Sequence, residues 1–181
     1  MASPSTPPDA AGEPVAETQR LTLRRLEVGD APFILELLTD PDWRRYIGDK
    51  GVRNLDDARR YIAEGPVAMY AKHGFGLFVV GRKPSGAPMG LCGLIRRDGL
   101  DDVDVGYAFL PRFRGCGYAE ESAAAMLRFA RERVGLSRIV AITNPENERS
   151  IRVLERLGFA YERMIRLTPE SREVKLFGRN V

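Results

Sequence analysis

A short segment at 112–119, with the sequence RFRGCGYA, combines glycine and arginine in a way that could bind phosphate groups. Gly115 and Gly117 have no Cβ and can adopt positive φ angles, so their backbone can approach a bulky anion closely. Arg112 and Arg114 would add guanidinium groups, which match phosphate oxygens well. The segment precedes a predicted helix, whose first N–H groups and dipole favour an anion. We therefore predict a phosphate or diphosphate seat, and the alternative is an ordinary turn with solvated arginines.

Two well-known phosphate motifs do not fit this turn. A P-loop would need Gly-Lys-Ser or Gly-Lys-Thr after the glycines, and none follows. A dinucleotide fingerprint would need a third glycine where Glu120 stands. The segment therefore indicates a phosphate-bearing ligand of another class.

The residues around this segment predict the elements that must position it. The alternating stretch at 102–110 is rich in Val, Tyr and Phe and predicts a strand, and 119–134 predicts an amphipathic helix. A second strand is expected at 138–143. A second helix is expected at 148–157, with Asn147 as its N-cap. The glycine-bearing turn thus leads from a strand directly into a helix N-terminus.

This ordered set of motifs resembles the GNAT acetyltransferase superfamily. The set extends over 102–159 and consists, in order, of a strand, the R-x-x-G-x-G segment, a helix, a second strand, an asparagine-bearing loop and a helix that ends in Leu-Gly-Phe. The stretch at 17–41 is similar to the start of the RimJ/RimL-type branch, whose named members acetylate N-termini of ribosomal proteins. The resemblance covers about 17–178. It implies an α/β (α+β) fold with a mixed, largely antiparallel sheet of about six to seven strands. Helices would lie on both faces, and a splayed parallel strand pair would hold the cofactor.

The resemblance implies that acetyl-CoA is the acetyl donor and that a primary amine attacks its thioester directly. The pantetheine arm would run beside the strand that ends at 110, and the diphosphate would sit on the amides of about 114–119. Asn147 matches an asparagine that contacts the cofactor in the family, although a pure helix cap is the alternative. The predicted cofactor-binding residues are Phe109, Leu110, Arg112, Arg114, Gly115, Cys116, Gly117, Tyr118, Ala119 and Asn147.

Two residues are predicted to be catalytic through the same resemblance. Asp104 stands where this branch usually has a glutamate, and it is the candidate base; the alternative is a solvent-facing strand carboxylate. The family often has a tyrosine as leaving-group acid at the position of Leu154, so that group is absent. Ser150 matches a serine proposed for the departing thiolate in the N-terminal-acetylating branch, and the alternative is a polar helix residue.

Trp43 and Tyr46 could form a wall of the acceptor pocket, or they could anchor their segment to the core. The acceptor itself stays open between a protein N-terminus and a small amine such as an aminoglycoside, polyamine or amino acid. A polycation would favour an acidic pocket, and the only acidic group that could provide one consists of Asp98, Asp101, Asp102 and Asp104. Two rival functions are a catalytically idle acyl-CoA sensor and a module that binds nucleotide phosphates or nucleic acid.

Composition limits the remaining possibilities. The chain has 181 residues, a formal net charge of +3 and 44% hydrophobic residues, as expected for one globular domain. We expect this domain at 19–181, after a disordered Pro/Ala-rich tail at 1–18. Cys92 and Cys116 suggest neither a disulfide framework nor a metal cluster. A cytoplasmic protein is therefore expected, with no metal, no membrane or nucleic-acid partner, and either a monomeric or a homodimeric state.

Overall fold

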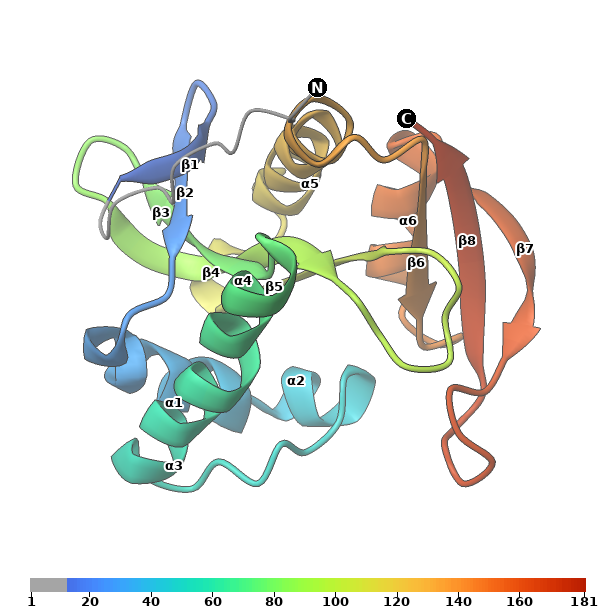
Figure 1. The fold of residues 1–181 in the computed structure, drawn as a ribbon. Coiled ribbons are helices and arrows are strands. Elements are labelled where there is room, and N and C mark those ends of the chain that lie inside the picture. Colours follow the sequence, from blue (N-terminus) through green and yellow to red (C-terminus); the bar gives the residue numbers. More distant parts are fainter. Residues whose placement is uncertain (1–12) are drawn as a thin grey trace.

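A sheet of eight strands, in the order β1-β2-β3-β4-β5-β6-β8-β7, organises the computed structural model, which describes residues 13–181 (Figure 1). The strands are β1 (Pro14–Glu17), β2 (Leu21–Arg25), β3 (Leu77–Arg82), β4 (Ala87–Ile95), β5 (Asp104–Phe109), β6 (Arg138–Thr143), β7 (Ala160–Ile165) and β8 (Val174–Asn180). The α-helices are α1 (Ala31–Thr39), α2 (Pro41–Tyr46), α3 (Leu55–Ile62), α4 (Ala68–His73), α5 (Tyr118–Phe129) and α6 (Glu148–Arg156). The predicted mixed sheet with helices on both faces is confirmed.

The two faces of the sheet carry separate hydrophobic clusters because side chains alternate along each strand. On β3, Phe78 and Val80 belong to the cluster that includes Met126 of α5 and Leu154 of α6. Val79, between them, belongs to the cluster formed with the apolar residues of α1, α2 and α3. Helices α1 to α3 therefore pack on one side of the sheet, and α5 and α6 pack on the other, where Tyr70 of α4 joins their cluster (Figure 1).

All neighbouring strands pair antiparallel except β5 and β6, which run parallel. Their ladder contains one pair only, Asp104 with Val140, at the start of β5. Beyond this pair the two strands diverge, so β5 and β6 leave backbone groups unpaired between them. This is the splayed strand pair that the family resemblance implies.

The N-terminal boundary differs from the prediction. Residues 1–12 of the expected tail lie outside the described part of the chain, but Pro14–Glu17 forms strand β1. It pairs antiparallel with β2, and Val15 and Ala16 pack against the core. A disordered tail reaching residue 18 was therefore wrong for this stretch, because the outer edge of β2 offers backbone partners that local composition does not reveal. Strand β1 also brings the expected six or seven strands to eight.

The described residues contain no helix that is both long and apolar enough to cross a membrane.

Candidate functional site

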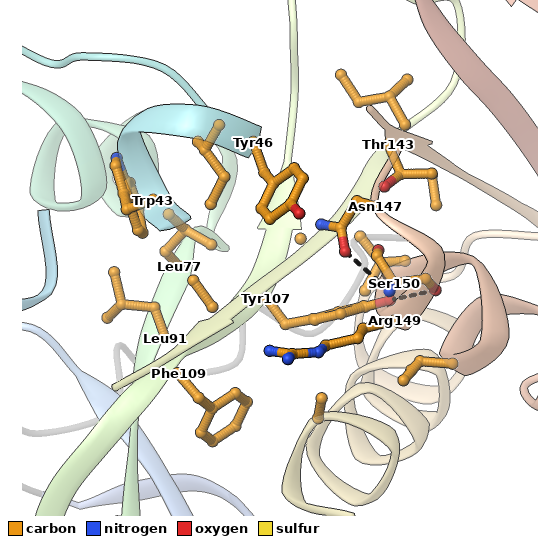
Figure 2. Close-up of a pocket in the computed structure, with 18 of the residues that line it drawn as sticks. Trp43, Tyr46, Leu77, Leu91, Tyr107, Phe109, Thr143, Asn147, Arg149 and Ser150 are labelled. Atoms are coloured by element: carbon orange, nitrogen blue, oxygen red, sulfur yellow. Dashed lines mark hydrogen bonds between the residues drawn. The ribbon is translucent and has the colours of Figure 1, made fainter. Parts of the chain in front are cut away.

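A cavity of about 570 Å³ opens where β5 and β6 diverge, and residues from both sides of the sheet line it. Figure 2 shows Trp43 and Tyr46 on one side, Asn147 and Ser150 on the other, and Tyr107 between them. The volume is in the range of small-molecule sites. The lining includes these predicted residues: Trp43, Tyr46, Asp104, Phe109, Arg114, Gly115, Gly117, Tyr118, Ala119, Asn147 and Ser150.

The glycine-bearing turn closes the cavity at the end of β5. Gly115 and Gly117 have φ angles of 74° and 80°, a region that residues with a Cβ rarely adopt. Gly117 is the N-cap of α5, which begins at Tyr118. The first N–H groups of this helix have no acceptor within the helix itself, and its dipole is positive at this end. The turn thus has the backbone geometry predicted for an anion seat.

Arg20, directly before β2, forms hydrogen bonds with this turn and with the first turn of α5. Its Nη1 donates to the Cys116 carbonyl at 3.1 Å and its Nε to Glu121 Oε2 at 2.7 Å. Its guanidinium also lies 4.6 Å from the centre of the Tyr118 ring. The sequence analysis missed Arg20, because 96 residues separate it from Cys116 and no local pattern connects the two.

Both arginines of the predicted seat are engaged with carboxylates. Arg114 contacts Asp40 at 2.5 Å and Asp42 at 2.7 Å, and its Nε donates to the Phe109 carbonyl at 2.8 Å. Arg112 pairs with Glu36 and does not line the cavity. The positive character of the turn therefore comes first from backbone N–H groups. A direct contact of either arginine with a phosphate stays a prediction.

Two other predicted residues lie apart from the cavity wall. Leu110 is 1% exposed and packs in the cluster on the α1 side, while its N–H donates to the Met89 carbonyl at 3.0 Å. Cys116 is exposed and does not line the cavity. Neither placement brings a side chain to a ligand between β5 and β6.

Asn147 caps α6, as predicted. Its side-chain oxygen accepts a hydrogen bond from the Ser150 N–H at 3.2 Å (Figure 2). The same residue lines the cavity. Its structural role is thus confirmed, and its contact with a cofactor stays a prediction.

A tyrosine that the sequence analysis did not select meets Ser150 across the gap. The Tyr107 hydroxyl of β5 lies 3.1 Å from Ser150 Oγ and donates to the Ser150 carbonyl at 3.2 Å (Figure 2). Burial raises the pKa of Tyr107, and its hydrogen bond with Ser150 only partly offsets this, so the phenol stays protonated at neutral pH. Strand alternation could have indicated the face on which Tyr107 lies, but not its distance from a residue 43 positions later.

Asp104 lies on the opposite face of β5, at the base of the gap. Its side chain is 1% exposed, so the solvent-facing alternative is excluded. Oδ2 pairs with Arg97 Nε at 2.6 Å, and Oδ1 accepts from the Ile142 N–H of β6 at 3.3 Å. Burial raises the pKa of Asp104, whereas Arg97 lowers it. The carboxylate therefore connects β5 to β6 and to the β4–β5 loop at the point where the two strands begin to separate.

Trp43 and Tyr46 both line the cavity from α2. Trp43 is 5% exposed and packs in the core, as the anchoring alternative expects, and its contact with an acceptor stays a prediction. The Tyr46 ring faces Asn147 across the cavity (Figure 2). Next to it, Arg45 pairs with Glu146 at 3.3 Å, so an exposed ion pair joins the two sides.

The acidic group considered in the sequence does not form an acidic pocket. Asp98, Asp101 and Asp102 do not line the cavity, and Asp102 pairs with Arg138 at 2.9 Å. Asp104 alone reaches the lining, where Arg97 faces it. Within 13–181, no group of three or more His, Cys, Asp or Glu residues could hold a metal ion.

Comparison with known proteins agrees with this geometry. The sequence profile described as Acetyltransferase (GNAT) domain matches residues 20–160. The uncharacterized protein YkkB of Bacillus subtilis (strain 168) is 30% identical over 152 residues, which are 82% of this chain and 87% of that protein. A GNAT-family acetyltransferase from Bacillus anthracis superposes with a TM-score of 0.76 at 26% identity, over 91% of this chain and 97% of that one.

The fold is also that of RimL, a ribosomal L7/L12 α-N-protein acetyltransferase whose structure was solved in complex with coenzyme A. The TM-score is 0.71 at 16% identity, over 93% of this chain and 98% of that one.

Proposed function

The chain belongs to the GNAT acetyltransferase family, and we propose that it transfers the acetyl group of acetyl-CoA to a primary amine. The observation that carries this proposal is the divergence of β5 and β6 after a single parallel pair. The cavity in that gap ends at a glycine-bearing turn that suits a diphosphate. A long ligand with phosphates at one end and a reactive group at the other fits this arrangement.

The residues of the gap are suited to bind acetyl-CoA, which supplies a thioester-activated acetyl group. The unpaired backbone groups of β5 can hydrogen-bond an extended amide-bearing arm as a neighbouring strand would. Gly115 and Gly117 hold the turn in its positive-φ conformation, and the first turn of α5 can receive the diphosphate. RimL, which shares this fold, was solved with coenzyme A, and this supports the same use of the gap here.

Asp104 is the proposed group that takes the proton from the incoming amine. An α-amino group with a pKa near 8 costs only about 1.4 kcal/mol to deprotonate at pH 7, so a modest base is sufficient. Burial raises the pKa of Asp104 toward the operating pH, which improves a carboxylate as a base. Arg97 opposes this shift and keeps the carboxylate oriented.

Ser150 and Tyr107 are the proposed proton donors on the sulfur side. They lie on the α6 side of β5, whereas Asp104 lies on the face that α1 to α3 cover. The Ser150 hydroxyl would donate to the departing sulfur, and the Tyr107 hydroxyl would hold Ser150 in place and share the proton. Many family members have a tyrosine as leaving-group acid at the position of Leu154. In this chain, Tyr107 would take over that role.

The test is thiol release from acetyl-CoA in the presence of peptides beginning with Ala, Ser or Met, free amino acids, polyamines and aminoglycosides. Isothermal calorimetry with coenzyme A measures the donor seat separately. Release with at least one amine, together with a micromolar Kd for coenzyme A, is the expected result. Folded protein that binds no coenzyme A would overturn the proposal.

An acyl-CoA sensor is the second candidate, because both oxygens of Asp104 are already hydrogen-bonded. A sensor would bind coenzyme A tightly and release no thiol with any amine of the panel. The same two measurements therefore separate the two functions.

A further inference from the structure

Near Asp104, the cavity is lined by two cationic side chains that still have free donor groups for an anion. Lys50, in the segment between α2 and α3, and Arg97, in the loop between β4 and β5, both line the cavity together with Asp104. Lys50 is an exposed residue, and no hydrogen bond or ion pair within 13–181 involves its ammonium group. Arg97 uses Nε for Asp104, and its Nη1 and Nη2 donate to no residue of that range.

Among the residues that the structure describes, no carboxylate acts on the Lys50 ammonium group. Loss of solvent lowers the pKa of its ammonium, and the second cause is the like charge of Arg97. Arg97 also acts on Tyr61, whose pKa burial raises to about 12. Asp42 lines the cavity too, but Arg114 binds it at 2.7 Å. Arg97 pairs with Asp104, and Lys50 adds a second positive charge to the same cavity lining, so this part of the cavity carries excess positive charge.

Strand alternation places this charge beside the reacting amine. Asp104, Gly106 and Ala108 share one face of β5, and Ala108 packs on the side of α1 to α3. The diphosphate turn lies at the other end of β5, about 16 Å away at the usual rise per residue. A donor held by that turn would bring its reactive end toward Asp104, with Lys50 and Arg97 close by.

We propose that the acceptor is a small amine with a carboxylate next to its amino group, as in a free amino acid, and that Lys50 and the Nη groups of Arg97 bind this carboxylate. This inference rests on the proposed acetyl transfer. The amino group would lie toward Asp104. One acceptor would then place its carboxylate at Lys50 and Arg97 and its amino group at the Asp104 carboxylate. The apolar side chains of Trp43, Ile47 and Met69 line the same side and would suit an apolar substituent. A polycationic acceptor would be repelled by Lys50 and Arg97.

The experiment compares L-phenylalanine with L-phenylalaninamide, and L-leucine with L-leucinamide, in wild type, Lys50→Met and Lys50→Arg. The amides lack the carboxylate and resemble a peptide N-terminus at the amine. Each kcat/KM is taken from thiol release, and the acid-to-amide ratio is compared between variants, so the different pKa values of the amines cancel. We expect Lys50→Met to lower this ratio at least tenfold and Lys50→Arg to lower it less than threefold.

Calorimetry with N-acetyl-L-phenylalanine and its amide gives a readout that does not depend on turnover, and the acid should lose affinity in Lys50→Met. Lys72→Met, an exposed lysine of α4 outside the cavity, is the matched control. If Lys50→Met is active and its acid-to-amide ratio of kcat/KM equals that of wild type, the inference is overturned. That result would favour a peptide N-terminus as acceptor and would leave the proposed acetyl transfer intact. Absence of release with every amine of both panels overturns the proposed function and this inference with it.

Discussion

The hydroxyls of Tyr107 and Ser150 lie 3.1 Å apart and connect β5 to α6 across the gap between β5 and β6. At Tyr107 no backbone pairing connects β5 to β6, since the two strands pair only at Asp104 and Val140. The hydroxyl pair is therefore a side-chain connection across the gap. It therefore fixes Ser150 against the strand beside which the thioester arm is proposed to lie.

If this pair donates to the departing sulfur, removing either hydroxyl lowers the rate of acetyl transfer. We expect Ser150→Ala and Tyr107→Phe each to lower kcat about 10- to 100-fold, because a positioned acid contributes about that much or more. The double variant should lose little beyond the worse single variant, because the two hydroxyls act as one unit. Thiol-release kinetics measure this, and calorimetry should show a Kd for coenzyme A within threefold of wild type. Fully additive losses would contradict a shared role.

The anion seat depends on the positive φ of Gly117, which is 80°. Gly117→Val should raise the Kd for coenzyme A at least tenfold, because a β-branched residue is strained in this conformation and its Cβ would lie 3.4 Å from Nη2 of Arg20, which donates to the turn. Gly135→Val is the control, since Gly135 has a φ of 78° at the end of the helix and does not line the cavity. Both variants should lose about 1–2 kcal/mol of stability. Calorimetry should show lost affinity only for Gly117→Val; equal affinity in both would contradict the seat.

The two arginines of the turn should behave differently. Arg114→Ala removes two ion pairs and a hydrogen bond to the Phe109 carbonyl, so we expect a loss of about 2 kcal/mol and a Kd for coenzyme A raised about tenfold. Arg112→Ala removes an exposed pair with Glu36 and the contact of the guanidinium with the Phe113 ring, and it should change stability by less than about 1 kcal/mol. Urea unfolding and calorimetry measure both effects. A large loss of coenzyme A affinity in Arg112→Ala would instead indicate direct phosphate contact.

Arg97 compensates a buried charge, so its removal should be costly. Arg97→Met leaves Asp104 buried without its cation, and we expect a loss of about 3 kcal/mol at pH 7. Arg96→Met, at the exposed neighbouring position, should cost less than about 0.5 kcal/mol. Urea unfolding measures both free energies. Equal costs for the two variants would show that the ion pair does not stabilise the fold.

The same carboxylate should make stability depend on pH. Burial raises the pKa of Asp104 above its unfolded value of about 3.9, so the folded protein binds more protons between the two values. The free energy of unfolding therefore falls as the pH rises from about 4 through the folded-state pKa. Arg97→Met should extend this fall to higher pH, because Arg97 lowers the pKa, and Asp104→Asn should remove it. Unfolding curves at pH 4 to 8 measure the slope, and an unchanged slope in Asp104→Asn would contradict this assignment.

The sequence predicted the local elements well where the pattern and its end signals agree. Arg138–Thr143 forms the strand predicted at 138–143, and α6 begins directly after its cap Asn147, because these signals act within a few residues. Strand β1 was not predicted, because a Pro/Ala-rich stretch becomes a strand only when the edge of β2 is available. The contacts of Arg20, Tyr107 and Arg97 could not be predicted either, because they depend on how separate elements pack against one another.

By itself, the sequence determined the positive-φ turn with its glycines, the order of strands and helices, and the likeness to one family, because these depend on residue type and short spacing. Only the tertiary structure decided which side chains share the cavity. It placed Arg112 and Arg114 in ion pairs, put Tyr107 against Ser150, and brought Lys50, Arg97 and Asp104 to the lining of one cavity. The physical reason is that distances between elements follow from how the diverging strands and their helices pack, and that packing is set by contacts between residues far apart in the chain.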